Sequence, residues 1–546
     1  MRNLFAVSTG LALLATVTPA CDTGPGAAKE PPVLEITTPT RGLVQAQANA
    51  MMVTGTVLPN AHGDAIKSVT VNGTAATVNA DGSFAARITM VEGVSLIETT
   101  ATDANGGTAS DTRAVASGEL HKVGDNIPAA VTAALSPDAF AKLSQAAGPL
   151  LMGLDLGTML KPMQPMLDKG GSALGAKAYV DGITLGGVNV ALTPVNGGIQ
   201  FRAELDQISG AGHVDYSVVY IPGSTDITVK AAKVVVTGTL NVTPNGMNGF
   251  TTKVVSPNVT LTSPVISASG VPGDILGILP LDTLLPLIAP PIIELAMNPL
   301  MNTALGALAG PQALDVLGMK LDVQVAPSAV QFASTGALMT IDMKMMIAGA
   351  ESSPGYIYTK NGKPTLDATT GFQIALADDL ANELLAELAA TGKLELGVAV
   401  PGGLFDTTKI HMTMPPMINA DATDGKLRLF LGDMQATFMK GTTAVGQAAI
   451  NARVDLQVSP AANGNSVALT LGTPEIHINV VDGVANQTGL DDKQLANATS
   501  AVLQGQIAQI ATLLTAVPLP AVAGLSVSNL SVGSDSGYVM IKGAFN

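Results

Sequence analysis

The feature that most limits the fold of this chain is an internal repeat. The apolar spacing of Leu135–Leu143 recurs at Leu376–Leu384. The ends of the two repeats also match, and their equivalent apolar positions are Val330, Phe332 and Ile341 in one and Leu530, Val532 and Ile541 in the other. The sequence therefore predicts two tandem copies of one unit, and any sheet that one copy builds should be built again by the other.

The predicted copies are residues 119–347 and 370–546, joined by a connector at 348–369. In the first copy Ser136 precedes Pro137, which is typical of an N-cap followed by proline in the first helical turn. In the second copy Asp378 and Asp379 occupy this place, where acidic groups interact favourably with the helix dipole. Strands follow in each copy, and a further helix is predicted near residues 292–308 and 493–515.

The run from Ile275 to Ala309 is apolar enough to raise the alternative of a membrane span. Prolines and two acidic residues interrupt this run, namely Pro280, Asp282, Pro286, Pro290, Pro291, Glu294 and Pro299. A spanning helix needs about 20 continuous residues, and proline removes a helical hydrogen bond. We therefore predict a buried or lipid-facing helix here.

Residues 33–118 have the pattern of short strands separated by turns. Asn72-Gly73 and Asp81-Gly82 are turn pairs, and Asn105-Gly106-Gly107 marks another turn. This spacing predicts a two-sheet sandwich. The segments Val71–Gly73, Asn79–Phe84 and Thr102–Gly107 resemble bacterial immunoglobulin-like modules of the kind found beside glucodextranase catalytic domains. Acidic turn residues offer a weaker alternative, a calcium site formed by Asp81, Asp103 and Asp111.

The first 20 residues have the pattern of an export signal. Arg2 precedes an apolar stretch from Leu4 to Val17, which is too short to span a bilayer comfortably. Because Cys21 follows this stretch, residues 1–20 resemble a bacterial lipoprotein signal peptide, and lipidation of Cys21 is expected. Residues 21–32 then form a tether. The alternative is an ordinary secretory signal cut near Ala20.

Charge and cysteine content exclude several classes of function. The chain has 27 basic and 42 acidic residues, a net charge of −15, which repels nucleic acid. Cys21 is the only cysteine, so neither an intramolecular disulfide nor a thiolate metal cluster can form. Apolar residues make up 47% of the chain and charged residues only 13%, which is typical of well-buried folded domains.

No arrangement of residues typical of catalysis is found in the sequence. The five histidines fall in separate segments without metal-ligand spacing, at positions 62, 121, 213, 411 and 477. The segment Gly170–Leu174 comes closest to a nucleophile elbow but lacks the closing glycine. We therefore expect a protein that is not an enzyme and that uses neither a cofactor nor a metal. A lipid or glycan hydrolase is a third and weaker possibility.

The layout of the two copies resembles the tubular lipid-binding superfamily, which includes bactericidal permeability-increasing protein, lipopolysaccharide-binding protein and cholesteryl ester transfer protein. Segments that carry this resemblance are Val325–Pro327, Thr340–Lys344, Val517–Pro520, Leu525–Leu530 and Tyr538–Ile541. It implies an α+β fold: the immunoglobulin-like β-sandwich is followed by two tandem elongated barrels, each a twisted antiparallel sheet wrapped on two helices around an acyl-chain tunnel. The chain departs from the family because it lacks the disulfide and both predicted barrels are acidic.

Residues expected to contact lipid lie on the predicted helices and on two methionine-rich strands. Unbranched methionine side chains can re-pack around ligands of different shape, although ordinary core filling is the simpler explanation for any single one of them. The expected lipid-binding residues are Phe140, Leu143, Ile292, Leu295, Leu380, Leu384, Leu388, Leu503, Ile507, Ile510, Met343, Met345, Met412 and Met414.

The leading hypothesis is an exported, membrane-anchored lipoprotein of the periplasm, outer membrane or cell surface. It would bind or transfer phospholipid or another acylated lipid by enclosing acyl chains in apolar tunnels. The alternative is a structural or adhesive surface protein whose barrels are filled by their own side chains.

Overall fold

The structure of the protein is a computed structural model. This structure describes residues 30–246, 249–268, 293–294, 297–299, 301–302, 313–316, 319–366, 371–399, 405–420, 427–460, 467–481, 487–488, 494, 497 and 527–545. The predicted signal segment, Cys21 and most of the predicted helix at 493–515 lie outside these residues.

The chain forms two compact units that interleave along the sequence. The first comprises residues up to Pro39, Met51–Ile88 and Glu98–Asp111. The second comprises Thr40–Ala50, Thr89–Ile97 and everything from Thr112 onwards. The region expected to form the sandwich therefore contributes residues to both units.

Strands of residues 33–117 form two sheets. The first sheet has the order β1 (Val33–Thr38), β3 (Met51–Leu58), β7 (Ser83–Ile88), β6 (Thr77–Val78). The second has the order β2 (Leu43–Gln45), β9 (Thr108–Ser117), β8 (Gly93–Asp103), β4 (Ile66–Val71), β5 (Thr74–Ala75). Asn72 and Gly73 form the β4–β5 turn with φ of 46° and 77°, as the turn pair predicted.

One sheet of the second unit contains the end strands of both predicted copies. Its antiparallel order is β19 (Ala313–Val316), β20 (Met319–Ala333), β21 (Gly336–Ile347), β11 (Ile127–Leu135), β23 (Phe372–Ala377), β32 (Tyr538–Phe545), β31 (Val527–Asp535). The two middle strands, β11 and β23, each come just before the first helix of a copy, and each is flanked by the last two strands of its own copy. From β20 to β31, the three strands of the first copy are therefore followed by the equivalent strands of the second copy in reverse order.

The remaining strands of each copy form a sheet of their own. In the first copy the order is β12 (Leu167–Gly170), β13 (Leu174–Thr184), β15 (Gly198–Val218), β16 (Ile221–Pro244), β17 (Phe250–Thr262), with β14 (Gly187–Val195) on β15 and β18 (Val265–Ala268) on β16. In the second it is β24 (Leu396–Ala399), β25 (Thr407–His411), β27 (Leu427–Lys440), β28 (Thr443–Pro460), β29 (Val467–Leu471), with β26 (Met417–Asn419) on β27 and β30 (Glu475–Val480) on β28. Among the described residues, each strand of one of these two sheets has a counterpart in the other. A short pair, β10 (Glu119–His121) and β22 (Tyr356–Tyr358), completes the described strands.

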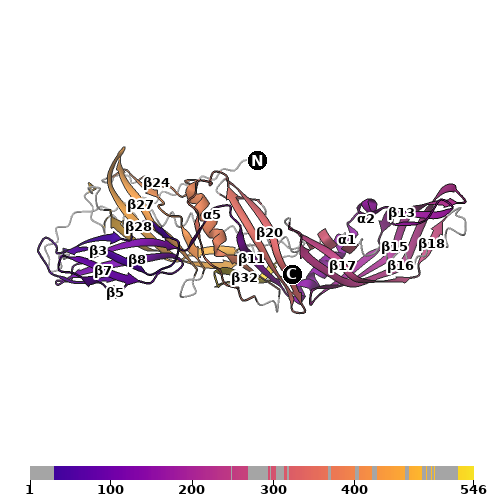
Figure 1. Cartoon of the computed structure of the whole chain (residues 1–546), viewed down its shortest axis with the longest axis horizontal. Coiled ribbons are helices and arrows are strands. Elements are labelled where there is room, and N and C mark those ends of the chain that lie inside the picture. The colour runs from indigo at the N-terminus through magenta and orange to yellow at the C-terminus, as the bar shows by residue number, and fades with distance from the viewer. Residues whose placement is uncertain are drawn as a thin grey trace. The chain divides into compact units, whose positions relative to one another are not determined.

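A helix begins at the predicted place in each copy. Helix α1 (Pro137–Met152) is capped by Ser136, whose hydroxyl accepts from the Ala139 N–H, and is followed by α2 (Leu156–Leu160) and the 3₁₀ turn η1 (Lys161–Met163). Helix α5 (Asp378–Ala390) opens the second copy. α1 packs on β14, and α5 contacts β21, β22 and β26. Both helices are labelled in Figure 1. Among the described residues no helix is both long and apolar enough to cross a membrane.

The helix predicted near residues 292–308 is helical at its described positions, and its polar side chains bind the outer strand β17. The Val254 N–H donates to Glu294 and the Thr252 N–H to Asn298, both over 2.7 Å. The Phe250 N–H donates to Asn302 over 2.7 Å. Four helical residues rise about 6 Å and two strand residues about 6.7 Å, so helix positions four apart match strand positions two apart.

Replacing Asn298 tests this helix–strand contact. In N298L the buried Thr252 N–H and hydroxyl lose their shared acceptor, while the isosteric N298D keeps an oxygen there. We expect N298L to lower the free energy of unfolding by about 1–3 kcal/mol and N298D to lower it less. Chemical denaturation of both variants measures this, and equal losses would contradict the assignment.

Candidate functional site

The polar side of helix α5 is buried. Leu385 and Leu388 pack into the core on one side of the helix. The opposite side buries polar groups that each have at most 2% of their surface exposed, namely Asp378, Asp379, Asn382, Glu383 and Glu387. Because buried carboxylates need hydrogen-bond donors, this side must be matched by groups from elsewhere in the chain.

Backbone amides of several separate segments supply these donors. The Ala420 N–H donates to Asp378 over 2.9 Å, and the Ile418 N–H donates to Asn382 Oδ1 over 2.7 Å. Glu383 accepts from the Gly124 N–H, and Glu387 accepts from the Ile347 N–H over 3.1 Å. Helix α5 therefore joins β26, β21 and the segment before β11.

Asp379 completes this polar side and corrects one expectation. Its carboxylate accepts from the Thr359 N–H over 3.0 Å and from Asn361 Nδ2 over 2.9 Å. The sequence suggested that Asp378 and Asp379 cap α5, but no side chain caps this helix end. Both residues lie in the first turn, and their carboxylates bind neighbouring segments because these segments bury them.

Burial raises the pKa of three α5 carboxyls. The pKa of Asp379 is raised to about 8 by burial and then by the charge of Asp378. Burial raises the pKa of Glu383 to about 8, and the neighbouring Glu387 charge adds to this. The pKa of Glu387 is raised to about 7, again by burial first. Burial together with the Glu383 charge also raises the pKa of Tyr356.

These shifts predict that stability falls as the pH rises. Because these pKa values are raised in the folded state, the folded chain binds more protons than the unfolded chain between about pH 4 and pH 8. The stabilisation that proton binding gives is therefore complete below about pH 4 and is lost as the pH rises to about 8. E383Q keeps an oxygen for the Gly124 N–H but does not titrate. We expect a flatter decline of melting temperature with pH in E383Q than in the wild type, and no change of slope in a control at the exposed Glu98, E98Q. An E383Q slope equal to that of wild type would contradict the burial of this charge.

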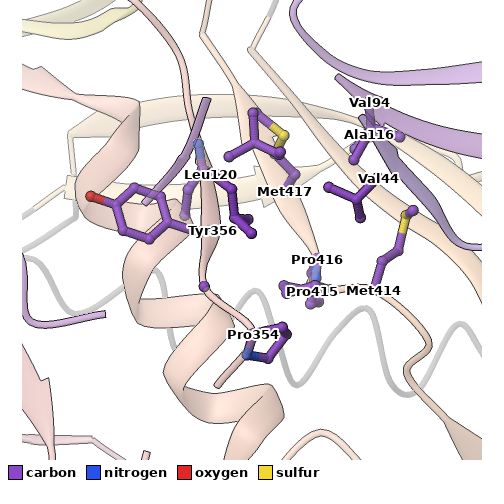
Figure 2. A pocket seen from close by; sticks show the side chains of 13 residues that line it. Val44, Val94, Ala116, Leu120, Pro354, Tyr356, Met414, Pro415, Pro416 and Met417 are labelled. Carbon is purple, nitrogen blue, oxygen red and sulfur yellow. The ribbon is translucent and has the colours of Figure 1, made fainter. Parts of the chain in front are cut away.

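An apolar pocket of about 160 Å³ lies beside α5, entirely within the second unit. Its lining comes from six strands, two loops and the helix: Val44, Val94, Ala116, Leu120, Pro354, Gly355, Tyr356, Ile357, Asn382, Met414, Pro415, Pro416 and Met417. Figure 2 shows the side chains of Met414 and Met417 facing this space together with Val44 and Val94, while the Tyr356 hydroxyl points away. The pocket contains no charged side chain in its lining.

A buried carboxylate holds the wall of this pocket in place. Asp433 accepts from Arg41 and the Ala114 N–H, each over 3.0 Å, and from the Gly42 N–H over 2.8 Å. These donors precede β2 and lie in β9, the strands that carry Val44 and Ala116. At Gly432 a side chain would overlap Met414 and Ala114, so glycine permits β27 to approach this wall closely. The pocket is thus fixed by polar contacts outside its lining.

A second cavity of about 420 Å³ lies at β12, β13 and β15. It is lined by glycines and by charged and polar residues, including the ion pair between Lys177 and Asp168 at 3.0 Å. Among the described residues no cluster of histidine, cysteine or acidic groups has the geometry to hold a metal. Asp103, one of the three acids of the calcium alternative, stabilises its own turn, because its carboxylate accepts from the Asn105 and Gly107 N–H groups.

The residues expected to contact lipid fall into three sets. Met414 lines the pocket. Phe140, Leu143, Leu388, Met343 and Met345 are buried in the main hydrophobic core, and Leu380, Leu384 and Met412 are half-buried against it. The others lie outside the described residues, namely Ile292, Leu295, Leu503, Ile507 and Ile510, and so does the predicted lipidation site Cys21. The structure thus brings Met414 together with residues that the sequence did not single out.

Sequence reasoning missed most of the pocket because its walls come from distant segments. Val44, Val94 and Ala116 belong to the predicted sandwich, and Pro354 belongs to the predicted connector. One signal was readable, the segment Met414-Pro-Pro-Met417. Proline lacks an N–H and cannot donate a hydrogen bond to a neighbouring strand. The Pro-Pro pair therefore predicts that this segment interrupts the sheet.

One part of the chain is similar to a known family model. The family model "Glucodextranase, domain B" matches residues 32–118, in agreement with the resemblance of that region to such modules. No curated protein matches the chain. Among solved structures, lipopolysaccharide binding protein is 12% identical over 76% of this chain and 99% of its own, with a TM-score of 0.35. P47 of Clostridium botulinum E1 is 9% identical over 76% of this chain and 98% of its own, with a TM-score of 0.27. Both scores are below 0.5, so neither similarity decides the fold or the ligand.

Proposed function

We propose that this chain is an exported lipoprotein that binds or transfers lipid and holds the apolar part of its ligand in the pocket beside α5. The observation that carries this proposal is the pocket itself, which is apolar apart from one asparagine and the Tyr356 ring. Removal of hydrocarbon from water contributes about 0.8 kcal/mol for each methylene group. A dry cavity of roughly this size admits a benzene-sized guest, so the pocket fits part of one acyl chain.

The remaining features of the proposal concern architecture and location. Each copy would form an elongated barrel, with its own sheet and two helices around an acyl-chain tunnel that continues the pocket. The segment at residues 1–20 would direct export, and lipidated Cys21 would anchor the chain to a periplasmic, outer-membrane or cell-surface bilayer. No enzymatic activity is proposed, because the pocket lining holds no nucleophile and no carboxyl group.

Organic extraction of the purified protein tests the proposal. We expect stoichiometric lipid in the extract of wild-type protein and a several-fold loss in V44F, because Val44 is 43% exposed in the lining and a larger side chain there fills the opening. The matched control is V33F, on an exposed strand position of the first unit. Mass spectrometry quantifies the lipid. Extracts without lipid would instead support the structural or adhesive alternative.

The hairpin of β15 and β16 supports contact with a lipid surface. Its turn residues Val219 and Tyr220 are each 71% exposed, and Ile221 is 70% exposed. Their backbone is fixed, because the Val219 and Tyr220 N–H groups donate to Ala173 and Ser172. Exposed apolar groups with a tyrosine are typical of membrane interfaces.

The backbone geometry of this turn does not favour valine and tyrosine. Val219 and Tyr220 have φ of 51° and 66°, a region that suits asparagine and glycine and strains β-branched or bulky residues. Strain of this kind is typically kept where function requires the residue. We infer that the apolar side chains are retained for an external contact.

The variant V219N/Y220G separates this contact from folding. Asn-Gly suits the turn, so we expect an equal or higher melting temperature together with at least tenfold weaker binding to phosphatidylcholine vesicles, because burial of each large apolar side chain contributes about 1.5–3 kcal/mol. Co-sedimentation measures binding, and zwitterionic vesicles avoid repulsion by the net charge of −15. Unchanged binding in the variant would remove the hairpin from the proposal.

A further inference from the structure

Two residues of the pocket lining carry a buried polar atom without a partner, Asn382 and Tyr356, and the Tyr356 hydroxyl points away from the pocket (Figure 2). Asn382 is 1% exposed and lines the pocket, and its Nδ2 donates to no acceptor. Its Oδ1 accepts from the Ile418 N–H over 2.7 Å. This bond fixes the orientation of the amide, because exchanging oxygen and nitrogen would place two donors against each other.

The protein offers this donor no acceptor of its own. Buried polar side-chain atoms are hydrogen-bonded in the large majority of cases, so an unpartnered one calls for an explanation. The rest of the lining is aliphatic, proline, methionine and glycine, together with the Tyr356 ring, whose hydroxyl points away (Figure 2). An acceptor that enters the pocket with a ligand satisfies the Asn382 donor without disturbing the bond to Ile418.

The lining decides what kind of acceptor this is. No lysine, arginine or histidine lines the pocket to balance an anion. A carboxylate or phosphate beside Asn382 would therefore be a buried charge without a counter-charge, whereas a neutral carbonyl needs none.

We propose that this pocket recognises a neutral carbonyl, an ester or ketone, on an apolar ligand, and that Asn382 is its specificity-determining residue. The inference rests on the proposed function, because it needs the pocket to hold a ligand. It adds the chemical class: neutral acyl esters are bound, and free fatty acid anions are rejected. Where the ligand is a diacyl lipid, the ester carbonyl and the first methylenes of one chain lie in the pocket and the charged headgroup lies outside.

Three ring compounds of similar size test the proposal on the full chain. Cyclohexanone carries a neutral carbonyl, cyclohexane carries no acceptor, and cyclohexanecarboxylate carries an anion. Titrations are followed by NMR of protein labelled with ¹³C at the methionine methyls and ¹⁵N at asparagine, with Met414 and Met417 reporting entry into the pocket. We expect cyclohexanone and cyclohexane to shift both methyls, cyclohexanone alone to shift the Asn382 amide, and cyclohexanecarboxylate to bind at least tenfold more weakly than cyclohexanone.

Substitution isolates the hydrogen bond. In N382L the affinity for cyclohexanone relative to that for cyclohexane should fall about tenfold, the usual worth of one such bond. The matched control is M417L, which changes the wall and keeps the donor, and it should leave this ratio unchanged. Because N382L also removes the acceptor of the Ile418 N–H, the wild-type Asn382 amide shift decides the matter if N382L does not fold.

The outcomes separate this inference from the proposed function. If cyclohexane and cyclohexanone both enter but the Asn382 amide does not respond and the N382L ratio is unchanged, the carbonyl assignment is overturned and the apolar pocket stands. Tighter binding of cyclohexanecarboxylate than of cyclohexanone would also overturn it. If none of the three compounds shifts Met414 or Met417, the pocket takes no ligand and both proposals lose their support.

Discussion

The second unit depends on hydrogen bonds from the N–H groups of outer strands to polar side chains on helices. Glu294, Asn298 and Asn302 accept from alternate residues of β17, and Asp378 and Asn382 accept from Ala420 and Ile418. Both rows run antiparallel to their strands with the four-to-two spacing that helix and strand geometry impose. Buried N–H groups at a strand without an outer neighbour would otherwise remain unpaired, at about 1–3 kcal/mol each.

This arrangement explains why α5 buries charge. A helix that must offer oxygens to Gly124, Ile347 and two residues near β26 needs carboxylate or amide side chains on its inner side. Burial then raises the pKa of Glu383 and Glu387. Asn382 differs from the acids because its oxygen accepts from the Ile418 N–H while its amide nitrogen remains a donor for the pocket. Stability and selectivity therefore arise from the same helix side.

The sequence predicted local features of this fold better than distant pairings. The Ser136 cap, the Asn72–Gly73 turn and the helical residues near Met297 follow from rules that act over a few residues. Helix α5 was expected to bury one leucine face, yet its polar side is buried as completely, because the donors lie in segments that periodicity cannot connect. The shared sheet and the pocket were missed for the same reason, since both join residues hundreds of positions apart.

The two copies have diverged where the pocket lies. Helix α1 packs on β14 as α5 packs on β26, the equivalent strand. In the first copy Ser144 accepts from the Leu192 N–H and donates to the Phe140 carbonyl, so it binds the strand without leaving a donor unpaired. Gly148 then permits a close approach to Val188. In the second copy Asn382 accepts from the Ile418 N–H, and its amide nitrogen has no partner. A helix can therefore bind its strand without an unpaired donor, and the proposed ligand contact accounts for the one at Asn382.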